Sequence, residues 1–186
     1  MALLAGEDFV NLFRTFEHTA YRLEVRESYY EKEQLGQFVA GAQVDLSYMD
    51  DWLVLMASLR AEGKRIERVR VVSQPFSDYT RYGLWLCQYN TRAGEDIRYL
   101  LRDNSAGLPS HDYWLFDSCR LYLVRFTDED ELLGAEPIED PATVIQHCFW
   151  RDAAWHYAVP YREFLKVTGF AVEHPAGARG ARQPSA

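Results

Sequence analysis

A strand–helix–strand pattern in the middle of the chain constrains the fold more than any other feature. The run RVRVV at residues 68–72 alternates charged and apolar side chains, which predicts a strand. Ser77 is placed to cap a helix that continues to about Tyr89 and is broken by Asn90 and Gly94. The alternation resumes over residues 97–102, which predicts a second strand. Two strands joined by a helix at this spacing are expected to be parallel neighbours in one sheet.

The segments on either side supply the remaining elements, each from its apolar spacing and its end signals. The sequence predicts a helix over residues 9–20, a strand over 21–26, helices over 31–40 and 51–62, a hairpin or meander from 112–117 and 121–127, and a last helix from Asp140 to Pro160. The apolar face predicted for that last helix consists of Val144, Ile145, Cys148, Phe149 and Trp155.

Together these elements predict the α/β class, as a single domain over residues 1–170 with a mixed β-sheet flanked by helices. Residues 171–186 carry no core-forming side chains and are predicted to be a disordered tail.

Composition, charge and cysteine spacing limit the classes of function that this chain can have. With 48% hydrophobic and 15% aromatic residues in 186, the chain is rich enough in apolar side chains to fold. A net charge of −8 disfavours nucleic acid as a partner, although a local arginine patch remains. The cysteines, Cys87, Cys119 and Cys148, lack metal or redox spacing and suit a reducing cytoplasm. No apolar run is long enough to span a membrane, and the first residues lack the pattern of a secretory signal. We therefore expect a cytoplasmic protein with no membrane partner.

One group of charged and aromatic side chains surrounds the central crossover. The helix after a parallel strand begins at the carboxyl edge of the sheet, where open α/β folds bind ligands. Its first N–H groups can hold an anion, and a guanidinium adds bidentate recognition of carboxylate or phosphate. The same side chains also suit a network of structural ion pairs, and this alternative stays open. The predicted ligand-binding residues are Arg70, Asp78, Tyr79, Arg81, Glu95, Asp96 and Arg98.

Two further candidates have weaker support. Glu24 lies between Arg22 and Arg26 in RLEVRESY, where it is either a positioned base or part of a solvated, charge-matched strand face; we favour the solvated face. His111 precedes Asp112 and resembles a general base with an orienting carboxylate. Sequence neighbours on a strand point to opposite faces, so we interpret His111 as a loop histidine without a function.

The sequence contains no complete catalytic or metal-binding motif. The histidines lack zinc spacing, and the acidic run at residues 128–131 lacks the glycine of a calcium loop. A Walker loop, a GxGxxG turn and a GxSxG elbow are also absent from the sequence. We predict neither a metal ion nor a cofactor.

Several motifs resemble a known family. In order along the chain they are RTFEHTAYRLEVRESY, RVRVVSQPFSDYTRY, NTRAGEDIRYLLR, DYWLFD and RDAAWHYAVPYREFL. They are similar to an uncharacterised actinobacterial domain of unknown function, over nearly all of residues 9–165. Members are often encoded near helix-turn-helix regulators, so the resemblance implies a regulatory or interaction role with such a regulator as partner. The family has no assigned catalytic residues, and none is carried over.

The order of elements is also similar to one phospholipase D-like lobe, a superfamily that acts through a His-x-Lys-x₄-Asp motif. Here His111 is present, but Tyr113 stands at the lysine position and Ser118 at the aspartate position. This second resemblance implies a phospholipase D-like fold without the catalytic motif, because no cation is left for the phosphoryl oxygens.

The first functional hypothesis is a non-enzymatic cytoplasmic interaction or small-ligand-sensing domain with a regulatory role, whose partner is a protein or a small anionic ligand. An interaction module would expose a contiguous apolar patch, for which Trp52, Trp150 and Trp155 are candidates. The alternative is an enzyme that acts on a phosphorylated or nucleotide-like small molecule. The residues that would form its site are Arg70, Tyr79, Arg81, Glu95 and Asp96.

Overall fold

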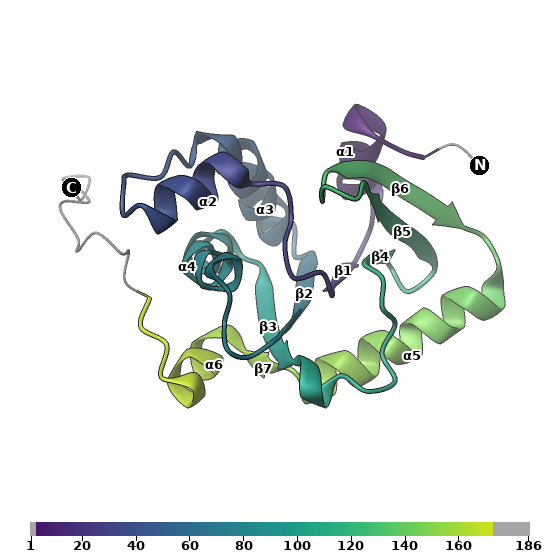
Figure 1. Ribbon diagram of the computed structural model, residues 1–186. Coiled ribbons are helices and arrows are strands. Elements are labelled where there is room, and N and C mark those ends of the chain that lie inside the picture. The colour runs from purple at the N-terminus through teal and green to yellow at the C-terminus, as the bar shows by residue number, and fades with distance from the viewer. Residues whose placement is uncertain (1–2, 173–186) are drawn as a thin grey trace.

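The computed structural model describes residues 3–172, which form a seven-stranded mixed sheet with helices on both faces (Figure 1). The strand order is β6-β5-β4-β1-β2-β3-β7, in which β1, β2 and β3 are parallel and the other pairs are antiparallel. This architecture confirms the predicted α/β class with a mixed sheet. The strands are β1 (Thr19–Glu24), β2 (Arg65–Val72), β3 (Asp96–Leu101), β4 (Tyr113–Phe116), β5 (Arg120–Phe126), β6 (Leu132–Ile138) and β7 (Val159–Pro160).

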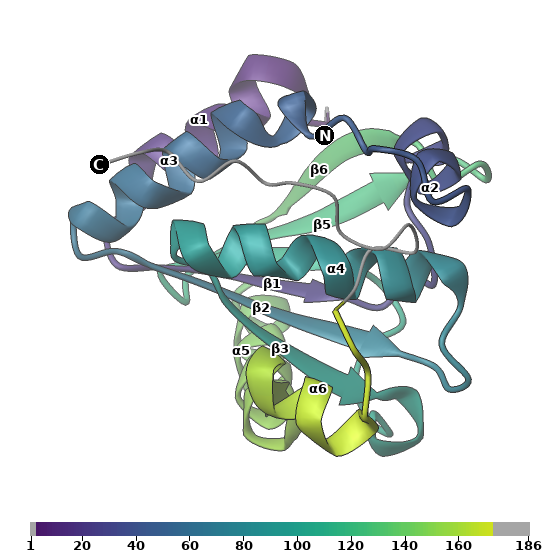
Figure 2. The ribbon, with the colours of Figure 1, turned by 90° about the vertical axis from the view of Figure 1, so that its left-hand side faces the viewer.

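The helices are divided between the two faces of the sheet. Figure 2 shows α4 lying across β1, β2 and β3, with α1 and α3 on the same side and α5 on the opposite side. The short α6 packs beside β3. The helices are α1 (Gly6–Thr15), α2 (Lys32–Val39), α3 (Asp50–Ala61), α4 (Asp78–Ala93), α5 (Pro141–Tyr157) and α6 (Tyr161–Thr168).

The predicted central crossover is confirmed, since β2 and β3 are parallel neighbours joined by α4. Ser77 caps α4 by accepting a hydrogen bond of 3.1 Å from the backbone N–H of Thr80. The helix runs one turn further than predicted, to Ala93, and ends where Gly94 adopts a left-handed conformation at φ 119°. Asn90, expected to break it, is tolerated because the tertiary packing of the helix overrides its weak propensity.

The first predicted helix is too long at its carboxyl end. It ends at Thr15, and Ala20 lies in β1 rather than on the helix. The Asp117 carboxylate accepts backbone N–H bonds from Glu17 at 2.9 Å and from residues 18 and 19, at 2.7 and 3.0 Å. Because these donors are committed to Asp117, they cannot continue a helical ladder, and the chain enters the strand extended.

The apolar face predicted for the last helix is wrong in part. Ile145 is 57% exposed and Phe149 is 66% exposed, whereas His147 faces the sheet. The imidazole is tolerated there because both nitrogens have partners: Nδ1 lies 2.7 Å from the Thr143 carbonyl and Nε2 lies 3.0 Å from Nε2 of His111. The helix ends at Tyr157, three residues before the predicted end at Pro160. Val159 and Pro160 form β7, and a further helix, α6, begins directly after them.

The predicted disordered tail, 171–186, lies outside the described residues except for Ala171 and Val172. Val172 packs on two of the hydrophobic clusters. Over residues 3–172, none of the helices combines the length and the hydropathy that crossing a bilayer requires.

The sheet face beneath α1, α3 and α4 changes from apolar to charged side chains along its strands. Ala20 and Ile66, at the start of β1 and β2, pack in an apolar cluster under α1 and α3. The next same-face positions on these strands are charged instead: Arg22, Glu24, Arg68 and Arg70. This charged row forms the floor of the candidate site.

Candidate ligand-binding site

A cavity of about 330 Å³ lies between the charged row of the sheet and the helices that cover it. Its floor is Arg22 and Glu24 of β1 with Arg68 and Arg70 of β2. Its walls come from α4, β3, the start of α3 with the turn before it, the loop before α2 and the β5–β6 hairpin. The wall residues are Tyr29, Tyr30, Glu31, Tyr48, Met49, Trp52, Tyr79, Gly83, Leu86, Cys87, Asn90, Ile97, Tyr99, Phe126, Asp130 and Leu132.

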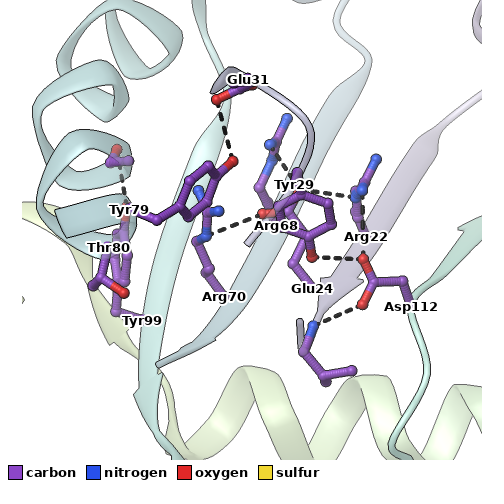
Figure 3. A network of polar contacts seen from close by, with 12 residues as sticks. Arg22, Glu24, Tyr29, Glu31, Arg68, Arg70, Tyr79, Thr80, Tyr99 and Asp112 are labelled. Carbon is purple, nitrogen blue, oxygen red and sulfur yellow. Dashed lines mark hydrogen bonds and ion pairs between the residues drawn. The ribbon is translucent and has the colours of Figure 1, made fainter. Parts of the chain in front are cut away.

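Glu24 is the centre of the floor, and three guanidinium groups surround it (Figure 3). Its Oε1 lies 2.9 Å from Arg22 Nε and 3.1 Å from Arg68 Nη1, and its Oε2 lies 3.5 Å from Arg70 Nε. The side chain is 4% exposed, so the predicted solvated face is wrong. The reason is that β1 is a central strand between β2 and β4, and central parallel strands are covered on both faces.

The ionisation of Glu24 follows from this setting. Burial acts to raise the pKa of Glu24, but the charges of Arg68, Arg22 and Arg70 outweigh it and hold the pKa at about 2. The carboxylate is therefore charged at neutral pH.

Two further buried carboxylates fix the outer ends of the arginines. Glu95 accepts hydrogen bonds from Arg68 Nη2 at 2.8 Å and from Trp52 Nε1 at 2.7 Å. Asp112 accepts from the backbone N–H of Val25 at 2.8 Å and from the Tyr29 hydroxyl at 2.6 Å. One Asp112 oxygen also lies 3.5 Å from Arg22 Nη2. The guanidinium groups are thus oriented before any ligand arrives.

Aromatic rings pack close to two of the guanidinium groups. The Arg70 guanidinium lies 5.4 Å from the Tyr29 ring centre and 5.2 Å from the Tyr79 ring centre. The Arg22 guanidinium lies 5.7 Å from Tyr29 and 5.3 Å from the Trp114 ring. These are cation–π distances, so the rings compete with a ligand for the faces of the cations. The N–H groups along the edges are what remains for an anion to bind.

Glu31 supplies a further carboxyl group, on the cavity wall. The Tyr79 hydroxyl donates to its Oε2 at 3.2 Å. Burial raises the pKa of Glu31, and the Arg70 charge and the Tyr79 hydrogen bond offset this only in part. Because its pKa is raised, Glu31 is the carboxyl of the cavity that takes up a proton most readily as the pH falls.

Unsatisfied polar atoms concentrate around this cavity. In residues 3–172, seven buried side-chain nitrogen or oxygen atoms have no hydrogen-bond partner. Four belong to lining residues: Arg22 Nε, Glu24 Oε2, Arg68 Nε and Asn90 Oδ1. The Arg22 and Glu24 atoms lie within ion-pair distance of a partner but without hydrogen-bond alignment. Buried polar groups normally have partners, so the cavity is suited to a polar occupant.

Of the residues predicted from sequence, the structure brings Arg70 and Tyr79 into the cavity and places Glu95 directly behind its floor. Asp78 and Arg81 are exposed at the start of α4, where Arg81 Nε donates to the carbonyl oxygen of residue 76 at 3.4 Å. These two side chains do not line the cavity.

Asp96 and Arg98 also lie away from the cavity. They form an ion pair of 3.8 Å with each other. Arg98 alternates to the opposite face of the sheet, where its guanidinium lies 3.7 Å from the Trp155 ring centre on α5. The predicted set of seven therefore divides between two faces of the sheet and one helix end.

Sequence reasoning left Arg22, Glu24 and Arg68 out of the site. A usable signal was present, because RLE in the first strand and RVR in the second each repeat a charged residue at every other position. In the parallel register, Arg22 is opposite Arg68 and Glu24 is opposite Arg70. Recognising that pairing would have placed all four side chains on one face.

His111 pairs with His147 rather than with Asp112, which points to the other side. His111 and Asp112 both precede β4, so their side chains diverge without belonging to a strand. Groups of three or more potential metal ligands are absent from the part of the chain that the structure describes. Trp52, Trp150 and Trp155 are half-buried and packed against neighbours, so they do not form the exposed apolar patch considered above.

Gly83 of α4 approaches Arg70 so closely that a side chain there has no room. A Cβ added at Gly83 would lie 2.7 Å from Arg70 Nη1 and 3.3 Å from its Cζ. We expect Gly83→Ala to lower the free energy of unfolding by about 1–3 kcal/mol, because the enclosed guanidinium must shift. Denaturant unfolding measures this.

Gly36 of α2 is the matched control, because a Cβ there meets nothing within 4 Å. Gly36→Ala is expected to raise stability by about 0.5–1 kcal/mol, the ordinary advantage of alanine in a helix. An equal gain in Gly83→Ala would show that Arg70 is not confined as described.

Three comparisons relate this chain to known proteins. A family model described as "Domain of unknown function (DUF6879)" matches residues 7–166. Among solved structures, the chain is similar to the crystal structure of a phospholipase D family member, Nuc from Salmonella typhimurium, at 9% identity and a TM-score of 0.49. That alignment covers 82% of this chain and 88% of the other, and the distant likeness concerns the fold alone. No curated protein matches.

Proposed function

This chain belongs to the DUF6879 family of domains of unknown function, and we propose that it binds a small molecule through an anionic group held by the arginines of the cavity. One observation carries the proposal. Three largely buried guanidinium groups, from neighbouring positions on two strands, face one cavity that also has four of the unsatisfied polar atoms on its lining residues. Oriented guanidinium groups in a buried setting are the usual means by which proteins bind carboxylates and phosphates.

The rival view, that these charges only organise the scaffold, explains less. A structural ion network is expected to close on itself with its polar atoms satisfied, because a half-satisfied network destabilises a core. Here Arg68 Nε and Asn90 Oδ1 stay unpaired beside open volume. A cavity of about 330 Å³ also falls within the range of small-molecule sites.

Thermal stability in the presence of candidate anions tests the proposal. The screen includes inorganic phosphate, nucleotides, phosphosugars and small carboxylic acids. A compound present at a hundredfold excess over its dissociation constant stabilises the fold by about 2.7 kcal/mol. We expect at least one such compound, and we expect Arg70→Gln to remove the stabilisation.

Arg81→Gln is the matched control, since Arg81 is an exposed arginine outside the cavity. It should leave the stabilisation unchanged. A hit that is lost in Arg81→Gln and kept in Arg70→Gln would reject the cavity as the site.

A second candidate function is an enzyme acting on a phosphorylated or nucleotide-like molecule. The observation that favours it is Glu31, a carboxyl with a raised pKa beside Tyr79 on the cavity wall, which suits a general acid or base. The candidate residues are now Arg70, Tyr79 and Glu31, because Arg81 and Asp96 lie elsewhere and Glu95 is committed to Arg68 and Trp52. Turnover that disappears in Glu31→Gln while binding persists would establish the enzyme.

We also propose a regulatory setting in the cytoplasm, in which ligand binding alters contact with a helix-turn-helix regulator. Its support is the family resemblance of the sequence motifs. Co-purification with such a regulator, repeated with and without a compound that binds the cavity, tests it. A contact that is absent, or that does not respond to the compound, would reject this role.

A further inference from the structure

The charges of the floor balance before any ligand binds. Arg22, Arg68 and Arg70 contribute three positive charges, and Glu24, Glu95 and Asp112 contribute three negative charges in contact with them. Two more carboxyl groups line the cavity wall. Asp130 is paired with Arg26, whereas Glu31 lacks an arginine within ion-pair distance in the described structure. The site therefore offers a surplus acceptor as well as guanidinium donors.

Asn90 provides a second, independent acceptor. Its Oδ1 is buried, has no hydrogen-bond partner, and belongs to a residue that lines the cavity. An amide oxygen in this state requires an N–H or O–H donor from the occupant or from water. A ligand that carries only acceptors, such as a fully ionised dicarboxylate, supplies no donor to Asn90 and no positive charge to Glu31.

We propose that the ligand is a small zwitterion, a carboxylate and an ammonium group in one molecule, of the kind found in a free amino acid with an apolar or aromatic side chain. Its carboxylate contacts the edges of Arg22 and Arg70, and its ammonium group is accepted by Glu31. Apolar walls at Trp52, Leu86 and Ile97 take the side chain. This inference rests on the proposed function, whose site it specifies.

Charge decides for a zwitterion over a plain anion. A zwitterion adds no net charge to the site. A plain anion adds a second negative charge beside that of Glu31, because the three floor arginines are already matched by three other carboxylates. In the proposed complex the ligand's ammonium group pairs with Glu31 and its carboxylate pairs with the arginines. Neither ligand charge is then buried without a partner.

The two ligand classes predict opposite pH dependence. Glu31 faces Arg70, Arg68, Tyr79, Glu24 and Tyr48, and its pKa is raised. An ammonium group needs Glu31 ionised, so zwitterion affinity increases as the pH rises through the pKa of Glu31. A plain anion needs Glu31 protonated, so its affinity decreases over the same interval.

Calorimetric titration of the full chain with matched ligands tests the inference. The probes are the free L-amino acids, with L-phenylalanine against 3-phenylpropionate and L-leucine against 4-methylpentanoate, plus inorganic phosphate. We expect an amino acid to bind at least tenfold more tightly than its deaminated match. Glu31→Gln should reduce that preference to less than threefold, whereas Arg70→Gln should abolish binding of both. Glu33→Gln, at an exposed glutamate in the first turn of α2 two residues after Glu31, is the control and should change nothing.

The outcomes separate this inference from the function beneath it. Equal binding of an acid and its amino analogue, or a preference that survives in Glu31→Gln, overturns the zwitterion inference. If the affinity in that case still depends on Arg70, the proposed anion binding stands. Tight binding of phosphate with no bound amino acid also overturns the zwitterion. Absence of any Arg70-dependent ligand overturns both.

Discussion

Glu24→Gln is expected to lower the free energy of unfolding by about 3–5 kcal/mol, the usual cost of removing one partner from a buried ion pair. Glutamine keeps the shape of the side chain but not its charge, so Arg22, Arg68 and Arg70 would remain close together without the carboxylate between them. Urea unfolding monitored by tryptophan fluorescence measures the loss.

Glu136→Gln is the control for this measurement. Glu136 pairs with Arg125 on the β5–β6 hairpin, where both side chains are at least one-third exposed. Exposed ion pairs contribute roughly 0–1 kcal/mol because water and salt screen them. Equal losses in the two variants would show that the Glu24 cluster is as open to solvent as the hairpin pair.

The pH dependence of the free energy of unfolding is a second test of the stabilisation by Glu24. Its folded-state pKa, about 2, lies below the ordinary 4.5, so the unfolded chain binds the proton more readily. The stabilisation is therefore fully present above about pH 4.5 and disappears as the pH falls toward 2. It is on the order of 3 kcal/mol. A wild type and a Glu24→Gln variant with parallel stability curves over this interval would contradict the assignment.

The fold was largely predictable because its decisive signals are local. The cap at Ser77, the left-handed Gly94 and the alternation on either side define the crossover within thirty or so residues. Asp140 and Pro141 likewise begin α5 as predicted. Where local reasoning failed, a distant residue decided: the Asp117 carboxylate ends α1 early by binding N–H groups about a hundred residues away in sequence.

The site was less predictable because it depends on which strands are neighbours. Arg22 and Arg68 share a face only once β1 is paired with β2 in parallel register, a contact over more than forty residues of sequence. A solvated strand and a buried row of charged side chains show the same charge alternation in sequence. The alternation around Glu24 therefore predicts a solvated face, although the side chain is buried. Conversely, Arg81 and Asp78 are close to Arg70 in sequence, but the helix turns their side chains outward.

Phe13→Ala is expected to destabilise the protein by about 3–5 kcal/mol, the range for truncating a buried phenylalanine to alanine. Phe13 is 1% exposed, and its ring contacts three aromatic rings of other elements edge-on, with centroid distances of 5.1 Å to Trp52, 4.8 Å to Trp114 and 5.3 Å to Phe116. It joins α1 to α3 and to the sheet, so a cavity there removes contacts from three elements at once.

The same substitution reaches the candidate site through Trp52. The Trp52 indole donates to Glu95, and Glu95 holds Arg68, so loosening the ring also loosens one support of the cavity floor. We therefore expect weaker ligand binding in Phe13→Ala than in a variant destabilised equally elsewhere, such as Phe164→Ala in the cluster beside β3. Phe149→Ala, at an exposed position of α5, should change stability by no more than about 0.5 kcal/mol. Equal ligand binding in Phe13→Ala and Phe164→Ala would mean that the packing of Trp52 does not affect the position of the arginines.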